Sequence, residues 1–209
     1  MKLLPHDSKV ATWFRGLMKR NSCDEPAALG EFIRAQGAYV AQKTVLDYCR
    51  VKAGRHEEKL FAEPVFRAAL DHCRWQVFFG ALADVTAMTE AWLRPHAENR
   101  RETLVEALAR LHDAALAVDP APEAEREAAG AFAIRAHLAG LQLAPPRPSH
   151  EMPLLAEAPL FATLPIHPDQ RIGEAPSIRG ALRGHMVSAR QEVERRFDAP
   201  RLAARLVAA

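Results

Sequence analysis

The chain has 209 residues, of which 49% are hydrophobic and 26% are charged, a composition typical of globular and not of disordered proteins. Its length suffices for one well-packed core, or for one core with an appended arm. The net charge of +2 excludes a strong overall attraction to nucleic acid or to anionic membranes, so any such attraction would be local. Arginine is far commoner than lysine and alanine is abundant, which we interpret as the coding bias of a GC-rich bacterial genome.

Cysteine usage favours a reducing compartment. Cys23, Cys49 and Cys73 are odd in number and widely spaced, and they contain no Cys-x-x-Cys pair, so they do not form a disulfide framework. The first residues are too few and too polar for the hydrophobic region of a signal peptide. We therefore expect a cytoplasmic protein.

The first predicted helix covers residues 8–20. Asp7 or Ser8 can cap it, and its apolar residues recur at helical spacing. Its remaining faces carry lysine and arginine. A basic amphipathic helix can lie on a membrane surface, so peripheral membrane contact through residues 7–20 is one interpretation. The first helix of a bundle is the interpretation we favour.

Two long helices follow. Asp24-Glu25-Pro26 is a helix start, and Gly54 is a stop for a helix over 26–52. A short link (55–63, with one helical turn at 57–61) leads to a second helix over 64–94. Because the connection is short, the two helices should form an antiparallel hairpin, each roughly 45 Å long at 1.5 Å per residue.

The second long helix carries one acid within its apolar stripe. Asp84 falls in the middle of a face formed by Phe66, Leu70, Cys73, Val77, Ala81, Met88 and Ala91. A carboxylate there needs a partner, a raised pKa or a solvated cavity. Asp84 and Glu90 also argue against a membrane span over 75–93, since each would cost about 2.5–3.5 kcal/mol near the bilayer centre.

The rest of the chain predicts shorter helices. We expect helices over 98–118 and 123–141, and eight prolines over 144–176 exclude long regular elements. One or two helical turns fit within 149–164, a last helix spans 177–197, and a frayed tail follows. The predicted fold is all-α: an irregular bundle built on the hairpin (1–143), a Pro-rich connector (144–176), and a C-terminal helix and tail packed on the core or extending from it (177–209).

Counting from the turn places side chains along the hairpin. Gly37 and Gly80 lie at matching depth, which suggests a close crossing of the two backbones. Asp47 and Asp84 differ in depth by 13 residues, roughly 20 Å. Paired glycosidase carboxylates lie about 5–10 Å apart, so these two acids should not form a catalytic dyad.

Each acid then has its own expected neighbours. For Asp84 these are Gln36 and, if its side chain swings round, Arg34. Asp47 has Lys43 and Arg50 at helical spacing on its own helix, with Arg74 at a similar level on the other. One interpretation is a polar cavity that holds an anionic or hydrogen-bonding ligand, and the other is a set of ion pairs that fix helix register. The candidate ligand-binding residues are Asp84, Gln36, Lys43, Asp47, Arg50 and Arg74.

No catalytic motif supports an enzyme. The sequence has no P-loop, no Gly-x-Ser-x-Gly and no His-Glu-x-x-His, so we assign no catalytic residue, metal ligand or cofactor. The segment 171–209 carries eight arginines against four acids, but it lacks interleaved aromatic residues, and we expect no nucleic-acid partner. The sequence favours a non-enzymatic interaction protein that binds another protein or itself. The alternative is a helical pocket protein or enzyme acting on a small, partly apolar ligand near Asp84 and Asp47.

Overall fold

The computed structural model describes residues 23–208, except 119, 126 and 129–131. The described residues form α-helices, short 3-10 turns and loops, with no strand among them. The all-α fold predicted from the sequence is therefore confirmed. The predicted helix over 8–20 lies outside the described residues.

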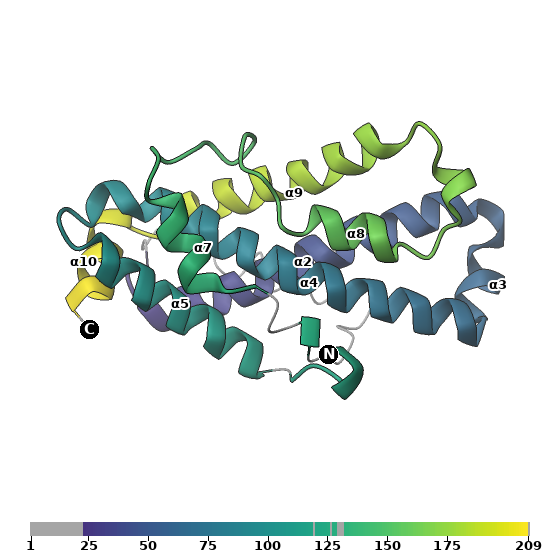
Figure 1. Cartoon of the computed structure of the whole chain (residues 1–209), viewed down its shortest axis with the longest axis horizontal. Helices are drawn as coiled ribbons and strands as arrows, with labels where there is room; N and C mark the ends of the chain where they lie inside the picture. The colour runs from purple at the N-terminus through teal and green to yellow at the C-terminus, as the bar shows by residue number, and fades with distance from the viewer. Residues whose placement is uncertain (1–22, 119, 126, 129–131, 209) are drawn as a thin grey trace.

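A long antiparallel hairpin organises the fold (Figure 1). It consists of α2 (Pro26–Ala53) and α4 (Pro64–Leu93), as the sequence predicts. At the turn, Gly54 adopts a positive φ of 51° and its N–H bonds to the Arg50 carbonyl, a conformation that glycine adopts readily. A 3-10 turn, η1 (Gly54–His56), and a short helix, α3 (Glu57–Ala62), complete the tip. Pro64 then occupies the first position of α4, where its missing N–H costs nothing.

Helices α5, α7 and α10 gather at the end of the hairpin opposite the tip (Figure 1). Leu93 is followed by η2 (Arg94–His96) and by α5 (Arg101–Val118), which packs on both hairpin helices. The helix expected over 123–141 is wrong as a continuous element. The structure instead has η3 (Glu123–Glu125), non-helical backbone at 132–133, and α7 (Ile134–Leu141). Glu125 forms hydrogen bonds with His72 and Gln76 of α4. These contacts hold η3 against α4, so that it does not continue into α7.

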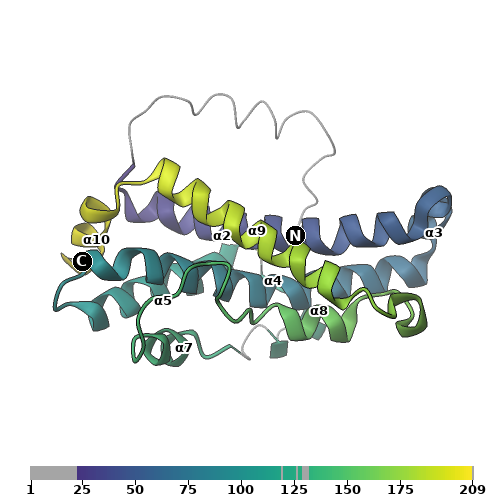
Figure 2. The ribbon, with the colours of Figure 1, turned by 90° about the horizontal axis from the view of Figure 1, so that it is seen from above.

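The Pro-rich connector contains α8 (Glu157–Thr163) and η4 (Pro168–Arg171), and its short helix lies beside α4 (Figures 1 and 2). Helix α9 (Ala175–Arg196) follows and packs on α2 and α4. Its buried stripe consists of Ile178, Leu182, Met186, Ala189 and Val193. The predicted last helix is thus confirmed, and it packs on the hairpin.

The frayed tail expected after residue 197 is wrong, because the chain forms a further helix, α10 (Ala199–Ala208). Leu202 and Leu206 are buried at i, i+4 spacing, in a segment that its many alanines and arginines make look featureless. Arg205 forms ion pairs with Asp24 and Glu25 at the start of α2. The C-terminal helix therefore packs against the start of the hairpin.

Candidate functional site

Asp84 is 1% exposed, and both of its carboxylate oxygens accept backbone hydrogen bonds from the connector. The Leu155 amide donates to Oδ1 at 2.7 Å, and the Ala156 amide donates to Oδ2 at 3.0 Å. Ala156 is the N-cap residue of α8, so the carboxylate binds the end of that helix at which N–H groups lack intrahelical partners. The expected neighbours on α2, Gln36 and Arg34, are not its hydrogen-bond partners.

Burial raises the pKa of Asp84 from its ordinary value of 3.8 to about 7, although the two backbone donors oppose the shift. The carboxylate therefore combines two of the alternatives posed by the sequence, a partner and a raised pKa. Its partners belong to the chain itself.

Gly80, one turn before Asp84, makes room for this contact. A Cβ atom at Gly80 would lie 2.6 Å from the Ala156 Cα and 2.7 Å from the Ala156 nitrogen. A Cβ at Gly37 would instead lie 3.0 Å from the Cα of Leu82 on α4. The expected close approach of the two hairpin backbones thus holds at Gly37. At Gly80 the close approach is to the connector, so the two glycines do not face each other.

The polar residues predicted along α2 do not converge on Asp84. Lys43 and Asp47 are paired at 2.7 Å, and their side chains are 42% and 43% exposed, so Asp47 does not point into the core. Arg50 lies 3.9 Å from Asp47 and 3.2 Å from Glu57 on α3. Gln36 is buried. The contacts of Lys43, Asp47 and Arg50 are ion pairs, and ligand binding by these residues stays a prediction.

Arg74 is the remaining predicted ligand residue. Its buried side chain donates from Nη1 to Asp71 of its own helix at 2.8 Å. Its Nε and Nη2 are buried and have no hydrogen-bond partner in the described part of the chain. Buried guanidinium donors normally find acceptors. Two of the donors of Arg74 are thus buried and unsatisfied within the described part of the chain.

Sequence reasoning missed a buried ion pair at the end of α4. Arg94 donates to both carboxylate oxygens of Glu90, at 2.8 and 2.6 Å, and also to the Ala144 carbonyl at 2.7 Å. Gln142 adds a bond to Glu90 at 2.9 Å. The i, i+4 spacing of Glu90 and Arg94 was the available signal. The network ties the start of the connector to α4.

A second missed contact joins α2 to the start of α9. Glu174 accepts hydrogen bonds from Tyr48 at 2.5 Å and from Lys52 at 2.7 Å. These bonds lower the pKa of Glu174, while burial and the adjacent carboxylate raise the pKa of Tyr48. Because the three residues are far apart in sequence, no local pattern could indicate this contact.

The three cysteines are free, as expected. Burial raises the pKa of Cys49 to about 12 and that of Cys73 to about 11. Because the thiolate is the reactive form, neither residue has the character of a nucleophile.

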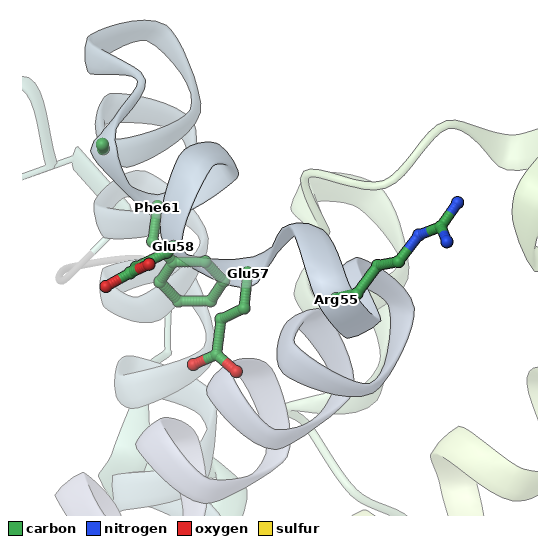
Figure 3. Close-up of a pocket in the computed structure, with 5 residues that line it drawn as sticks. Arg55, Glu57, Glu58 and Phe61 are labelled. Atoms are coloured by element: carbon green, nitrogen blue, oxygen red, sulfur yellow. The ribbon is translucent and has the colours of Figure 1, made fainter.

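The hairpin tip carries an open hollow of about 570 Å³, lined by Arg55, Glu57, Glu58, Phe61 and Ala62. Figure 3 shows the Phe61 ring beside the carboxylates of Glu57 and Glu58, while the Arg55 side chain extends away from them. The hollow is therefore aromatic at its centre and acidic at its edge. It lies far along the hairpin from Asp84.

Exposed aliphatic side chains gather at the same end of the molecule. Val51 in the last turn of α2 is 78% exposed, Val65 in the first turn of α4 is 84% exposed, and Ile172 is 80% exposed. Ile172 precedes Glu174, whose bonds to Tyr48 and Lys52 place this loop beside the end of α2. We call Val51, Phe61, Val65 and Ile172 the tip surface.

Among the described residues, no group of three or more His, Cys, Asp or Glu side chains could hold a metal ion. No helix in that part of the chain is long and apolar enough to cross a bilayer. Comparison with protein-family models, with curated proteins and with solved structures finds no match. The geometry of the chain itself is therefore the basis for the proposals below.

Proposed function

We propose that this chain is a non-enzymatic helical interaction protein, an adaptor, assembly factor or regulator of a bacterial cytoplasm, that binds a partner protein through the tip surface. The observation that carries the proposal is that three strongly exposed aliphatic side chains, Val51, Val65 and Ile172, lie at the end of the hairpin that also carries a hollow lined by Phe61. Apolar residues gathered within a polar surround commonly mark protein contact sites.

The acidic residues that line the hollow indicate which kind of partner side chain would bind there. Glu57 and Glu58 flank the Phe61 ring (Figure 3), and Glu58 is exposed. An aromatic face next to carboxylates favours a cationic side chain, by cation–π attraction and by ion pairing. The partner segment we propose therefore presents a basic side chain next to an apolar one.

The experiment compares matched substitutions on the tip surface and at an exposed site away from it. Val65→Glu places a charge on the tip surface, and Val118→Glu places the same charge on an exposed valine at the end of α5. Neither residue is buried, so both variants should fold. The protein is tagged and purified from the cells that naturally make it, and bound proteins are quantified by mass spectrometry.

We expect Val65→Glu to lose a stoichiometric partner that the wild type and Val118→Glu both retain. Glu58→Lys should weaken the same complex, while Lys59→Gln, on the other side of α3, should leave it intact. Equal retention by Val65→Glu and Val118→Glu would contradict the proposal. If the partner is a second copy of the chain, the same comparison applies to the mass of the oligomer.

A second candidate function rests on Arg74 and its two unpartnered buried nitrogens. It is the pocket function considered from the sequence, with a small anionic ligand held by the guanidinium. Native mass spectrometry of the wild type should then show an adduct of a few hundred daltons or less, and Arg74→Gln should lose it. A wild-type mass equal to that of the bare chain, with no adduct, would reject this candidate.

A further inference from the structure

A segment of the connector runs antiparallel to α4 along one stripe of that helix. We call residues 144–166 the strap. Near its start, Arg94 binds the Ala144 carbonyl; at its middle, Asp84 binds the amides of residues 155 and 156. Near its end, Thr163 contacts the Cys73 thiol. The contacts extend from residue 94 back to residue 73 of α4, roughly 30 Å of helix.

The strap is attached to the rest of the molecule by side chains. Among the described residues, its backbone–backbone hydrogen bonds join neighbours within the connector, such as Leu160 to Ala156 and Leu164 to Leu160. The links to other helices come from Asp84 on α4 and Arg94 on η2. Two more come from α9, where Arg183 donates to the carbonyls of His150 and Met152 at 2.8 and 3.0 Å and Arg179 forms an ion pair with Glu157. A few side-chain contacts therefore hold a long segment that shares no backbone ladder with its neighbours.

Apolar burial and the two hydrogen bonds to Asp84 oppose release of the strap, whereas the cost of burying the Asp84 carboxyl favours it. The strap buries six apolar side chains: Met152, Leu154, Ala156, Leu160, Leu164 and Ile166. Closure also buries the Asp84 carboxyl, which water would solvate in the open form. Structural units with few attachments open locally, at a lower free energy than global unfolding.

We propose that the strap opens from α4 as one unit while the hairpin stays folded. The hydrogen bonds to Asp84 and the close backbone approach at Gly80 hold it closed. Opening uncovers the stripe of α4 that contains Cys73, Gly80 and Asp84. The strap thus covers one face of α4, and this face is distinct from the tip surface. This inference does not depend on the proposed function.

Hydrogen exchange of the full chain at constant pH tests the proposal. We expect the amides of Leu155, Ala156 and Leu160 to exchange at least 100-fold faster than buried amides of α2 such as Val40 and Val45. Asp84→Ala should speed exchange of the strap a further tenfold or more and leave α2 unchanged. Arg183→Ala, which alters a partly exposed side chain, should have the same effect and covers the case in which Asp84→Ala fails to fold.

Alkylation of Cys73 by iodoacetamide gives an independent readout, because the thiol lies beneath the strap. It should accelerate in Arg183→Ala and not in Gly184→Ala, a control on the same helix whose added Cβ meets no atom within 4 Å. Equal exchange rates in the strap and α2 would overturn the proposal. An Arg183→Ala effect that spreads equally to α2 would also overturn it.

Discussion

Gly80→Ala gives the sharpest test of how the connector is held. The new methyl group would lie 2.6 Å from the Ala156 Cα, whereas ordinary contact begins at 3.4 Å, so the strap backbone must move by roughly 0.8 Å. The obstacle is backbone, which cannot rotate away as a side chain can. The two hydrogen bonds to Asp84, now 2.7 and 3.0 Å, would lengthen, and the longer one would pass beyond the normal hydrogen-bond range.

The cost follows from these contacts. Overpacking costs about 1–3 kcal/mol, and each weakened bond to a charged acceptor loses up to about 1.5–3 kcal/mol. Alanine recovers about 1 kcal/mol of helix propensity. We expect Gly80→Ala to lower the free energy of unfolding by roughly 2–4 kcal/mol, since the bonds are weakened and not both abolished.

Urea denaturation followed by circular dichroism measures this change, with Gly184→Ala as the matched control. That glycine is also helical, but a Cβ there meets nothing within 4 Å, so the control should gain about 0.5–1 kcal/mol. If Gly80→Ala proved as stable as the control, the close contact between α4 and the connector would be refuted.

Three further predictions concern other contacts. Glu90→Gln should destabilise the fold by about 3–5 kcal/mol in urea denaturation, because it leaves the buried Arg94 guanidinium without its counter-charge; a loss below about 1 kcal/mol would contradict the buried pair. The folded-state pKa of Asp84, about 7, lies above its ordinary value of 3.8, so its contribution to stability is fully present below pH 3.8 and is lost as pH rises through 7. The difference in unfolding free energy between wild type and Asp84→Asn, measured by denaturation at each pH, should therefore fall by up to about 4 kcal/mol between pH 4 and 8, and a pH-independent difference would exclude the shift. Leu206→Ala should cost about 2–5 kcal/mol in the same assay, because this side chain of α10 is buried; no effect would show that the C-terminal helix is not part of the core.

Helix boundaries were predictable where proline and glycine act locally. Pro26, Gly54 and Pro64 set the limits of the hairpin by backbone geometry alone, and the structure places both helices there. The C-terminal helix α10 was missed because alanine and arginine dominate its composition, although Leu202 and Leu206 carry the helical spacing. Such a short amphipathic pattern predicts a helix only when the surface on which its apolar face packs is known.

The environment of Asp84 was half predictable. Helical periodicity placed it on a buried stripe, and it is buried. Its partners are backbone amides of a connector that lacks periodicity, and a backbone amide leaves no mark in the sequence. Glu174 with Tyr48 and Lys52 shows the same limit, because the pairing depends on how α9 packs across α2.

Site-specific photo-crosslinking in the cells that make the protein tests whether a partner docks on the hairpin tip. A photoreactive phenylalanine analogue replaces Phe61 in the hollow, and in a matched strain it replaces Val118 at the C-terminal end of α5. We expect one discrete crosslinked partner from position 61, absent from position 118 and lost when Glu58→Lys is added. The same products from both positions, or none from position 61, would contradict a docking surface at the hairpin tip.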